Sequence, residues 1–553
     1  MIKVIKLGVV AHAYIPSTQE GVFKPMDLNH VIQLLEENDK DDLEEKQLKS
    51  VKKLVQCYQN GLPLRDLAKI FKILNLCAAK IENQHQFVES VYDILKLCSL
   101  PFLKKKVSDE ITYAEDTANS VALLGDLMKI PSSELRIQIC KCIVNFYHAE
   151  PPKKYIPGYQ QASSSYKAKM AEVGGLAKTM VQSITLLENQ LIEKLWVLKV
   201  LQHLSTSGNC TLMVKAQAAS KICAHLNDPD PSGQLLFRST EILWNLLEKS
   251  PKQEIIQQLS TLECLVTLKE VFKNLFMRGF SHYDRQLRND ILVITTIIAQ
   301  NLEAPMILLI DGKVVLALLT YVKKPEKHKV MEWSAAQYED LQLHAIATLS
   351  SVAPLLIEEY LSCQGNARVL AFLEWCESED PFFSHGNSFH GTGGRGNKFA
   401  QMRYTLRLLR AMVHLENETV NTDLCEKGTI QQLIGIFKNI ISRPNEKEEA
   451  IVLEIQSDIL LILSGLCEHH IQRKEIFGTE GVDIILHVMK TDAKKLQSDL
   501  GYNVLLFSTL DSIWCCILGC YLSEDYFLEK EGIFLLLDVL ANQTAASLLI
   551  KLW

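Results

Sequence analysis

Apolar residues recur along most of the chain with the period of an α-helix. The stripe is clear at Val197–Leu204, Leu406–Val413 and Ile455–Leu466. Spacing of i, i+3, i+4 and i+7 places these side chains on one face of a helix. Sustained β-type alternation is nearly absent, so we predict an all-α protein. The run Val314–Val322 is ambiguous and suits either a helix or a strand.

A short sequence motif recurs, which we call the Gly phrase: an acidic residue and a Gly precede an amphipathic helix. It stands at Glu426–Gly428, Glu480–Gly481 and Glu531–Gly532, with related forms at Glu172–Leu176 and Asp311–Val314. The last three glycines are 481 − 428 = 53 and 532 − 481 = 51 residues apart. A Gly ends one helix and lets the next begin at a sharp angle. We therefore predict an armadillo/HEAT-like α-solenoid, a right-handed superhelix of roughly ten to twelve units.

The chain divides into an extension and the solenoid. Residues 1–21 are expected to be a poorly ordered N-terminal extension, and residues 22–553 the solenoid. Longer connectors are expected at Ala149–Ser165, Asn227–Gly233, Lys323–Ser334 and, as a Gly-rich insertion, at residues 378–398. Lys3 and Lys6 precede an apolar run of about four residues, which is too short for a signal peptide.

Composition fits a folded protein of the cytoplasm. Hydrophobic residues make up 48% of the 553 positions, and the formal net charge is −7. These values exclude a disordered chain and argue against a nucleic-acid partner, which favours a strongly basic face. The fifteen cysteines mostly sit inside apolar helical patterns. Free cysteines of this kind are typical of a reducing compartment.

One segment, Leu500–Leu522, is long and apolar enough to test as a membrane span. Its centre carries Asn503, Ser508, Thr509 and Asp511, where polar groups cost most. We therefore interpret it as a pair of buried solenoid helices and expect no membrane insertion.

No motif indicates catalysis or a cofactor. The loop Gly391–Lys398 contains G-x-G-x-x-G, but no strand precedes it, and a mobile surface insertion explains it better than a dinucleotide site. His385 with His390, and Cys515 with its neighbours, do not provide the four convergent ligands of a structural zinc. Nucleophile-elbow and kinase signatures are absent from the sequence. We expect a non-enzymatic protein without metal or cofactor.

Two places are candidates for partner binding. In the Gly-rich loop these are Phe382, Phe383, Arg395 and Lys398. The second is Trp244-Asn245, because armadillo adaptors for nuclear import clamp extended peptides with an Asn on the inner helix of nearly every repeat. Asn145 is a second such position, but His203, Ser350, Ala411 and Ser464 stand at the others. A patchy ladder cannot hold one continuous peptide, and isolated asparagines are more often local hydrogen-bonding groups.

Long idiosyncratic strings closely resemble one family. They are Val22–Asn29, Lys104–Tyr113, Phe280–Asp290 and Trp375–Lys398. These segments resemble the cilia- and flagella-associated protein 69 family, and the similarity covers nearly everything from Val22 onward. The resemblance implies an armadillo-type scaffold of the axoneme without known catalysis. It also implies a place on a central-apparatus projection of motile cilia, a requirement in sperm flagella and a role in olfactory cilia.

The sequence departs from the family pattern at defined places. Residues 1–21 do not match its start, and the family carries further helices between Ile307 and Leu308. Residues 541–543 look like a second join, and the family continues beyond Trp553. The expected partners are other central-apparatus proteins, with the tubulin lattice as a neighbour. The alternative is a soluble armadillo adaptor that binds extended peptides in transport or signalling.

Overall fold

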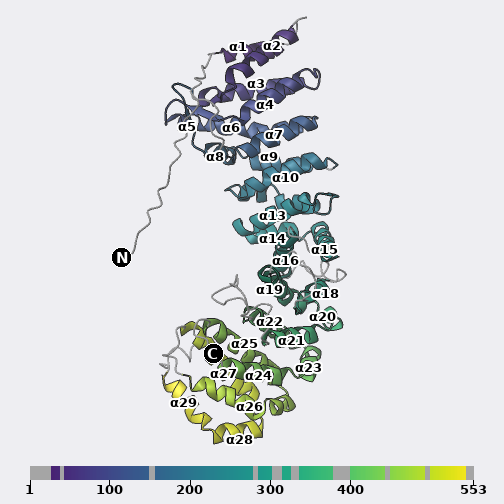
Figure 1. The fold of residues 1–553 in the computed structure, drawn as a ribbon, viewed down its shortest axis with the longest axis vertical. Coiled ribbons are helices and arrows are strands. Elements are labelled where there is room, and N and C mark those ends of the chain that lie inside the picture. Colours follow the sequence, from purple (N-terminus) through teal and green to yellow (C-terminus); the bar gives the residue numbers. More distant parts are fainter. Residues whose placement is uncertain are drawn as a thin grey trace, which may run out of the picture. The chain divides into compact units, whose positions relative to one another are not determined.

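The chain folds almost entirely into stacked α-helices, as Figure 1 shows for the computed structural model. The structure describes residues 26–37, 43–148, 156–187, 189–277, 284–301, 314–324, 335–377, 399–442, 449–491 and 499–542. It separates into two compact units, Met1–Leu259 and Ser260–Trp553. The predicted all-α solenoid is therefore confirmed.

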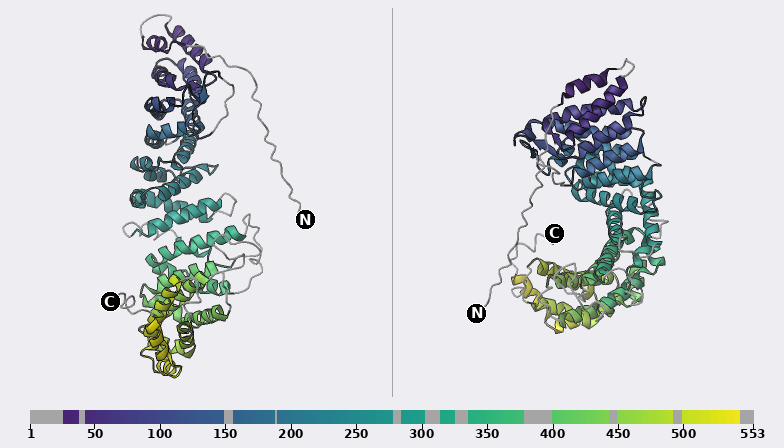
Figure 2. Two further views of the ribbon diagram at one scale, coloured as in Figure 1. Left: turned by 90° about the vertical axis from the view of Figure 1, so that its left-hand side faces the viewer. Right: turned by 45° about the horizontal axis from the view of Figure 1, so that its top comes forward.

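Unit 1 consists of two rows of helices that run side by side. The first row contains α1 (Leu28–Glu36), α3 (Leu67–Lys80), α6 (Ala114–Asp126), α9 (Leu176–Ile184), α12 (Ala218–Ala224) and α14 (Lys252–Leu259). The second row contains α2 (Leu43–Tyr58), α4 (Phe87–Ser99), α7 (Ser133–Asn145), α10 (Leu191–Ser205) and α13 (Gln234–Lys249). Shorter helices join the rows: α5 (Asp109–Thr112), α8 (Tyr166–Val173) and α11 (Cys210–Lys215). The views in Figures 1 and 2 show these helices as successive layers.

The layers arise from the apolar stripes and from capping residues at the helix starts. In α3, for example, Ile70, Phe71 and Leu74 are completely or almost completely buried. Ser132 caps α7 by accepting from the backbone N–H of Leu135, which satisfies one of the unpaired donors of the first turn. Gly175 has φ 72°, a left-handed conformation that turns the chain from α8 into α9.

Unit 1 carries a small three-stranded sheet, and one of its strands lies inside a predicted connector. Strands β1 (Leu62–Pro63) and β2 (Phe102–Lys104) pair in parallel, and β2 pairs antiparallel with β3 (Gln160–Gln161). The connector predicted at Ala149–Ser165 is therefore partly a strand. Strands this short carry no periodic signal in the sequence.

Unit 2 repeats the same architecture. One row contains α16 (Asp284–Ala299), α19 (Ala335–Val352), α22 (Phe399–Val413), α25 (Glu449–Cys467) and α27 (Asp499–Ser512), which a π-helical turn, Ile513–Ile517, extends. The other helices are α15 (Leu262–Met277), α18 (Val314–Leu319), α20 (Ile357–Ser362), α21 (Gly365–Glu377), α23 (Glu418–Glu426), α24 (Thr429–Ser442), α26 (Ile471–Met489), α28 (Tyr521–Glu529) and α29 (Gly532–Asn542). The ambiguous run at Val314–Val322 thus begins as a helix.

The repeated Gly phrase marks the breaks only in part. Gly428 has φ 78°, as expected for a residue between two helices. In the next phrase the break lies at Gly478 (φ 52°), three residues before the predicted Gly481. In the last one, Glu531 itself takes the left-handed conformation, with φ 60°, and Gly532 begins α29. The repeat was predicted correctly, but the turning residue shifts from one repeat to the next.

The described residues contain one helix that is long and apolar enough to cross a membrane. Its window is Ala450–Cys467 in α25, with a mean hydropathy of 1.8 and 67% of its residues buried. It packs between α22 and α27, as a core helix of the solenoid does. The segment Leu500–Leu522, tested above, is divided among α27, the π-helical turn and the start of α28.

Candidate protein-binding surface

The second row of unit 1 presents cations and aromatic rings on its exposed side. Lys141 of α7 is exposed, whereas Trp196 and Lys199 of α10 are half-buried. The ammonium of Lys141 lies 5.4 Å from the centroid of the Trp196 ring, and that of Lys199 lies 5.0 Å from it. Two ammonium groups, one from each of two neighbouring helices, therefore lie close to the Trp196 ring. Within the described residues, neither lysine has an ion pair with a carboxylate.

The same face continues onto α4. Lys96 is exposed, and its ammonium lies 4.3 Å from the centroid of the Tyr92 ring. It also faces the Asp93 carboxylate at 3.6 Å, so its charge is partly balanced. We call Tyr92, Lys96, Lys141, Trp196 and Lys199 the basic–aromatic stripe. It places one lysine on each of three consecutive helices of the row.

Two histidines lie next to the stripe, near the C-terminal end of α7. The rings of Tyr147 and His203 stack at 5.5 Å, and His148 meets His203 edge-on at 5.4 Å. Burial lowers the pKa of the His203 imidazole, and His148, Lys199 and Arg238 lower it further. Lys199 and Arg238 thus lie close enough to His203 to oppose its protonation, while Glu172 lies near the stacked Tyr147 ring.

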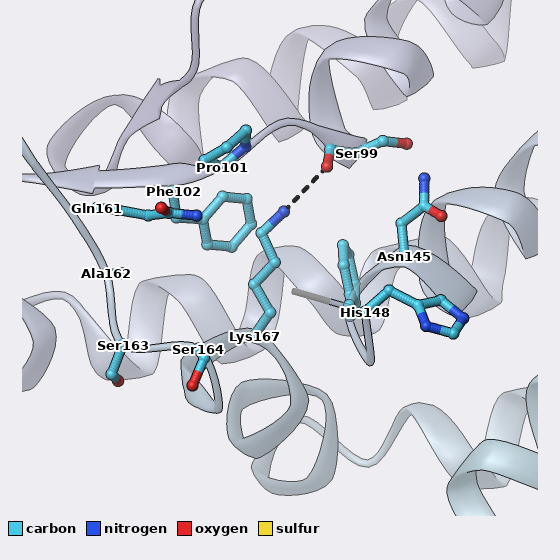
Figure 3. A pocket seen from close by; sticks show the side chains of 11 residues that line it. Ser99, Pro101, Phe102, Asn145, His148, Gln161, Ala162, Ser163, Ser164 and Lys167 are labelled. Carbon is cyan, nitrogen blue, oxygen red and sulfur yellow. Dashed lines mark hydrogen bonds between the residues drawn. The ribbon is translucent and has the colours of Figure 1, made fainter. Parts of the chain in front are cut away.

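A pocket of about 360 Å³ opens beside this region (Figure 3). Its walls come from the ends of α4 and α7, from β2 and β3, and from α8; they include Ser99, Phe102, Asn145, His148, Gln161 and Lys167. The Lys167 ammonium donates to the backbone carbonyls of Ser99 at 3.2 Å and Leu100 at 2.5 Å. It also lies 4.3 Å from the Phe102 ring centroid, so it caps the C-terminus of α4 and lines the pocket with positive charge.

The loop that forms one wall of the pocket is held by Glu110. Its carboxylate accepts from the backbone N–H of Ser163 at 2.8 Å and from the Lys104 ammonium at 2.7 Å. Burial alone would raise the pKa of this carboxyl group, but the hydrogen bonds from Lys104 and Ser163 outweigh it and lower the pKa. The Glu110 carboxylate thus holds Ser163 and with it this wall of the pocket.

A second hollow, of about 720 Å³, lies on unit 2 between α22, α25 and α27. Its arginines already lie against carboxylates, three arginines facing two acidic side chains. Arg410 pairs with Asp458 at 2.6 Å, and Arg403 and Arg407 pair with Glu454. With its cations already paired, this hollow attracts an anionic partner less than the basic–aromatic stripe does.

The partner residues predicted from the sequence lie in two places. Phe382, Phe383, Arg395 and Lys398 fall outside the described residues. Asn245 is only 9% exposed, and its amide donates to the Ser205 hydroxyl on α10 at 2.9 Å.

The other residues at inner-helix positions of the predicted asparagine ladder differ from one another in burial and hydrogen bonding. Trp244 is half-buried, and Asn145 is half-buried at the pocket wall. Ser464 is buried and shares a hydrogen bond of 3.0 Å with Ser512. A partner-binding role for Trp244 and Asn245 remains a prediction.

The stripe was missed at the sequence level for a physical reason. Trp196 and Lys199 are three residues apart and share a helix face, which the sequence could have shown. Lys141 joins them only because α7 stacks against α10 in a particular register. No local pattern fixes that register.

The described residues show no metal-binding cluster at this surface. Among them, no group of three or more His, Cys, Asp or Glu side chains is arranged to hold a metal ion. All fifteen cysteines are free, and most are buried. What the surface offers is charge, aromatic area and a pocket.

Comparisons with known proteins point in one direction. The profile of the family described as cilia- and flagella-associated protein 69, ARM repeat, matches residues 26–309 and 307–551. Cilia- and flagella-associated protein 69 of Homo sapiens is 76% identical over 626 residues, which cover 97% of this chain and 66% of that protein. The Mus musculus protein is 71% identical with the same coverage. The chain therefore spans just under two thirds of the length of these relatives.

The alignment and the solved structures add two facts. The 626 aligned residues exceed the 553 of this chain, so the relatives carry residues within the matched region that this chain lacks. An engineered protein aligns with 88% of this chain and 99% of its own, at a TM-score of 0.47 and 12% identity. A designed armadillo repeat protein for modular peptide recognition aligns with 52% of this chain and 99% of its own, at a TM-score of 0.36 and 14% identity.

Proposed function

The chain belongs to the cilia- and flagella-associated protein 69 family, and from this membership we propose that it is a non-enzymatic structural scaffold of the axoneme. It is an armadillo-repeat protein associated with cilia and flagella. The proposal adds a finer place, a projection of the central apparatus. It also adds a role in sperm flagellum assembly and motility and in olfactory cilia.

The observation that carries the scaffold role is the stacked second row of unit 1, with its partly exposed basic–aromatic stripe. Each helix packs on the next through a continuous buried core, so the side chains on the exposed face keep fixed spacings. Fixed spacing over several helices suits the docking of other proteins, whose affinity concentrates in a few aromatic and cationic anchors. The partners we propose are other projection subunits of the axoneme.

A second candidate function is a soluble adaptor that binds extended peptides in transport or signalling. Asn145 at the pocket wall favours it, because its amide is not fully buried. The Asn245 amide, by contrast, already donates a hydrogen bond to the Ser205 hydroxyl inside the solenoid. We prefer the axonemal scaffold, since an adaptor of this kind depends on a regular ladder of available amides.

Fractionation of motile cilia tests the proposed place. We expect the full-length protein to remain with the axoneme after detergent extraction of membrane and matrix. We further expect it to be missing from axonemes that lack the central pair, whereas an outer-doublet protein, as the control, is present in both. Release by detergent alone contradicts the scaffold role, and equal amounts with and without a central pair contradict the central-apparatus location.

A further inference from the structure

The basic–aromatic stripe and the adjoining pocket form one continuous surface. Asn145 and His148 line the pocket, and His148 contacts His203, which stands one turn beyond Lys199 on α10. From this continuity we propose that the surface binds an extended, acidic peptide segment of a partner protein. The proposal names the partner chemistry for the scaffold function above and rests on it only for the partner's location.

Charge complementarity selects the occupant. Lys141 and Lys199 point their charges at the shared Trp196 ring, and no carboxylate pairs with either of them in the described residues. Of the carboxylates near this surface, Asp93 faces Lys96 and Glu241 accepts from Gln202 of α10, whereas Glu172 lies near Tyr147. A carboxylate that approaches Lys141 or Lys199 therefore displaces no existing carboxylate, which lowers the cost of binding at these two positions.

The aromatic rings set the shape of the occupant. Trp196 and Tyr92 are half-buried, so each exposes part of a flat ring held in place by its helix. Such rings contribute contact area at a small entropic cost, whether the occupant is a peptide backbone or an apolar side chain. The pocket then offers the amides of Asn145 and Gln161 at its wall, groups that match backbone carbonyl and N–H groups.

Helix spacing predicts the sequence period of the peptide. Neighbouring packed helices lie about 8–10 Å apart, and a peptide in the polyproline II conformation advances about 3.1 Å per residue and presents the same face at every third residue. A carboxylate at roughly every third residue would then meet Lys96, Lys141 and Lys199 in turn. A nucleic acid would need a longer cationic track, so we favour the peptide and treat nucleic acid as an outcome of the test.

Fluorescence anisotropy with the purified full chain tests the proposal. The probes are a fluorescein-labelled peptide with Glu at every third position among Ser and Gly, a peptide of the same composition with the Glu residues adjacent, and a labelled oligothymidine. We expect the spaced peptide to bind most tightly and to weaken with added salt. Tighter binding of the oligothymidine, or no binding of the spaced peptide, overturns the proposal.

Matched charge reversals locate the site. We expect Lys141→Glu with Lys199→Glu to weaken binding about tenfold or more, since both cations face the peptide. The control is Lys69→Glu with Lys178→Glu, the same charge change at exposed positions of α3 and α9 in the first row. The control should bind within about twofold of the unaltered chain. Equal weakening by both pairs overturns the proposal, and circular dichroism melting verifies that each variant is folded.

The fluorescence of Trp196 supplies a second readout, which a folding defect alone would not reproduce. We expect the spaced peptide to change the tryptophan fluorescence of the chain and Trp196→Phe to abolish that change. A fluorescence change that persists in Trp196→Phe contradicts the assigned site. Binding in these assays does not depend on ciliary location, so the peptide proposal and the axonemal proposal fail independently.

Discussion

The ammonium of Lys194, whose side chain is only 2% exposed, lies 2.5 Å from Oδ2 of Asp228. Lys194 belongs to α10, and Asp228 follows α12, so the pair ties two layers of unit 1 together. His225 completes the cluster, since its Nδ1 lies 3.0 Å from the same carboxylate oxygen and 3.3 Å from the ammonium. A buried cation of this kind is tolerated only while its partner is present.

Removing the carboxylate is therefore expected to destabilise the solenoid. Asp228→Asn removes the carboxylate that faces the buried Lys194 ammonium, and we expect the free energy of unfolding to fall by about 1–3 kcal/mol. Lys194→Met with Asp228→Asn removes both charges, so its loss should be smaller than the sum of the two single losses. Urea denaturation of all three variants measures this, and strict additivity would show that the pair contributes no coupling.

Close packing between layers predicts a second, steric effect. A Cβ at Gly174 would lie 2.3 Å from the carbonyl oxygen of Ala118 on α6, and backbone cannot move aside cheaply. We expect Gly174→Ala to lower stability by about 1–3 kcal/mol. Gly435, inside α24, is the matched control because nothing lies within 4 Å of its added Cβ. Gly435→Ala should be neutral or stabilise by up to about 1 kcal/mol, as helix propensity implies. Thermal melts that show equal effects would contradict the packing described here.

The hydrogen bond between Asn245 and Ser205 predicts a structural cost for losing the Asn amide. We expect Asn245→Ala to lower the free energy of unfolding by about 1–2 kcal/mol, because the bond is buried. Denaturation combined with Ser205→Ala measures the coupling between the two positions. If Asn245→Ala leaves stability unchanged and weakens retention in the axoneme, the residue acts on a partner instead.

Buried thiols predict a loss of stability at alkaline pH. Burial raises the pKa of the Cys77 thiol from 9.0 to about 12, and that of Cys142 to about 11. The unfolded chain therefore releases these protons at lower pH than the folded chain, so the stabilisation is complete below about pH 9 and is lost between about pH 9 and 12.

A single substitution isolates the contribution of one thiol. Cys77→Ala removes one raised group, so the free energy of unfolding should fall less steeply with pH in the variant. Between about pH 8 and 10 the difference is expected to be about 1 kcal/mol. Urea denaturation across that range measures it. Parallel slopes for the two proteins would mean that the Cys77 thiol ionises as readily in the folded chain as in the unfolded one.

Much of the fold could be predicted because helix periodicity and the turn at Gly428 are local signals. The turns at Gly478 and Glu531 could not be predicted, because tertiary packing determines which residue adopts the left-handed conformation there. Strand β3 at Gln160–Gln161 exists only because distant Phe102–Lys104 lies beside it. Pairing between segments so far apart leaves no local trace in the sequence.

The candidate surface was harder to predict than the fold. Trp244-Asn245 fits the inner-helix pattern of an armadillo repeat, yet the sequence could not reveal that Ser205 stands opposite Asn245. In the same way, Lys141 could not be recognised as part of the surface without its contact to Trp196 on the next helix of the row. Contacts between neighbouring repeats depend on their register, which one sequence does not specify.

The central claim is that this stack of helices serves as a scaffold among other axonemal proteins. Cross-linking mass spectrometry on intact motile axonemes tests it most directly, because lysines on both units can report their neighbours. The expected result is a set of cross-links from this chain to central-apparatus subunits, including links from segments next to the basic–aromatic stripe. Cross-links that lead only to soluble cytosolic proteins would contradict the claim.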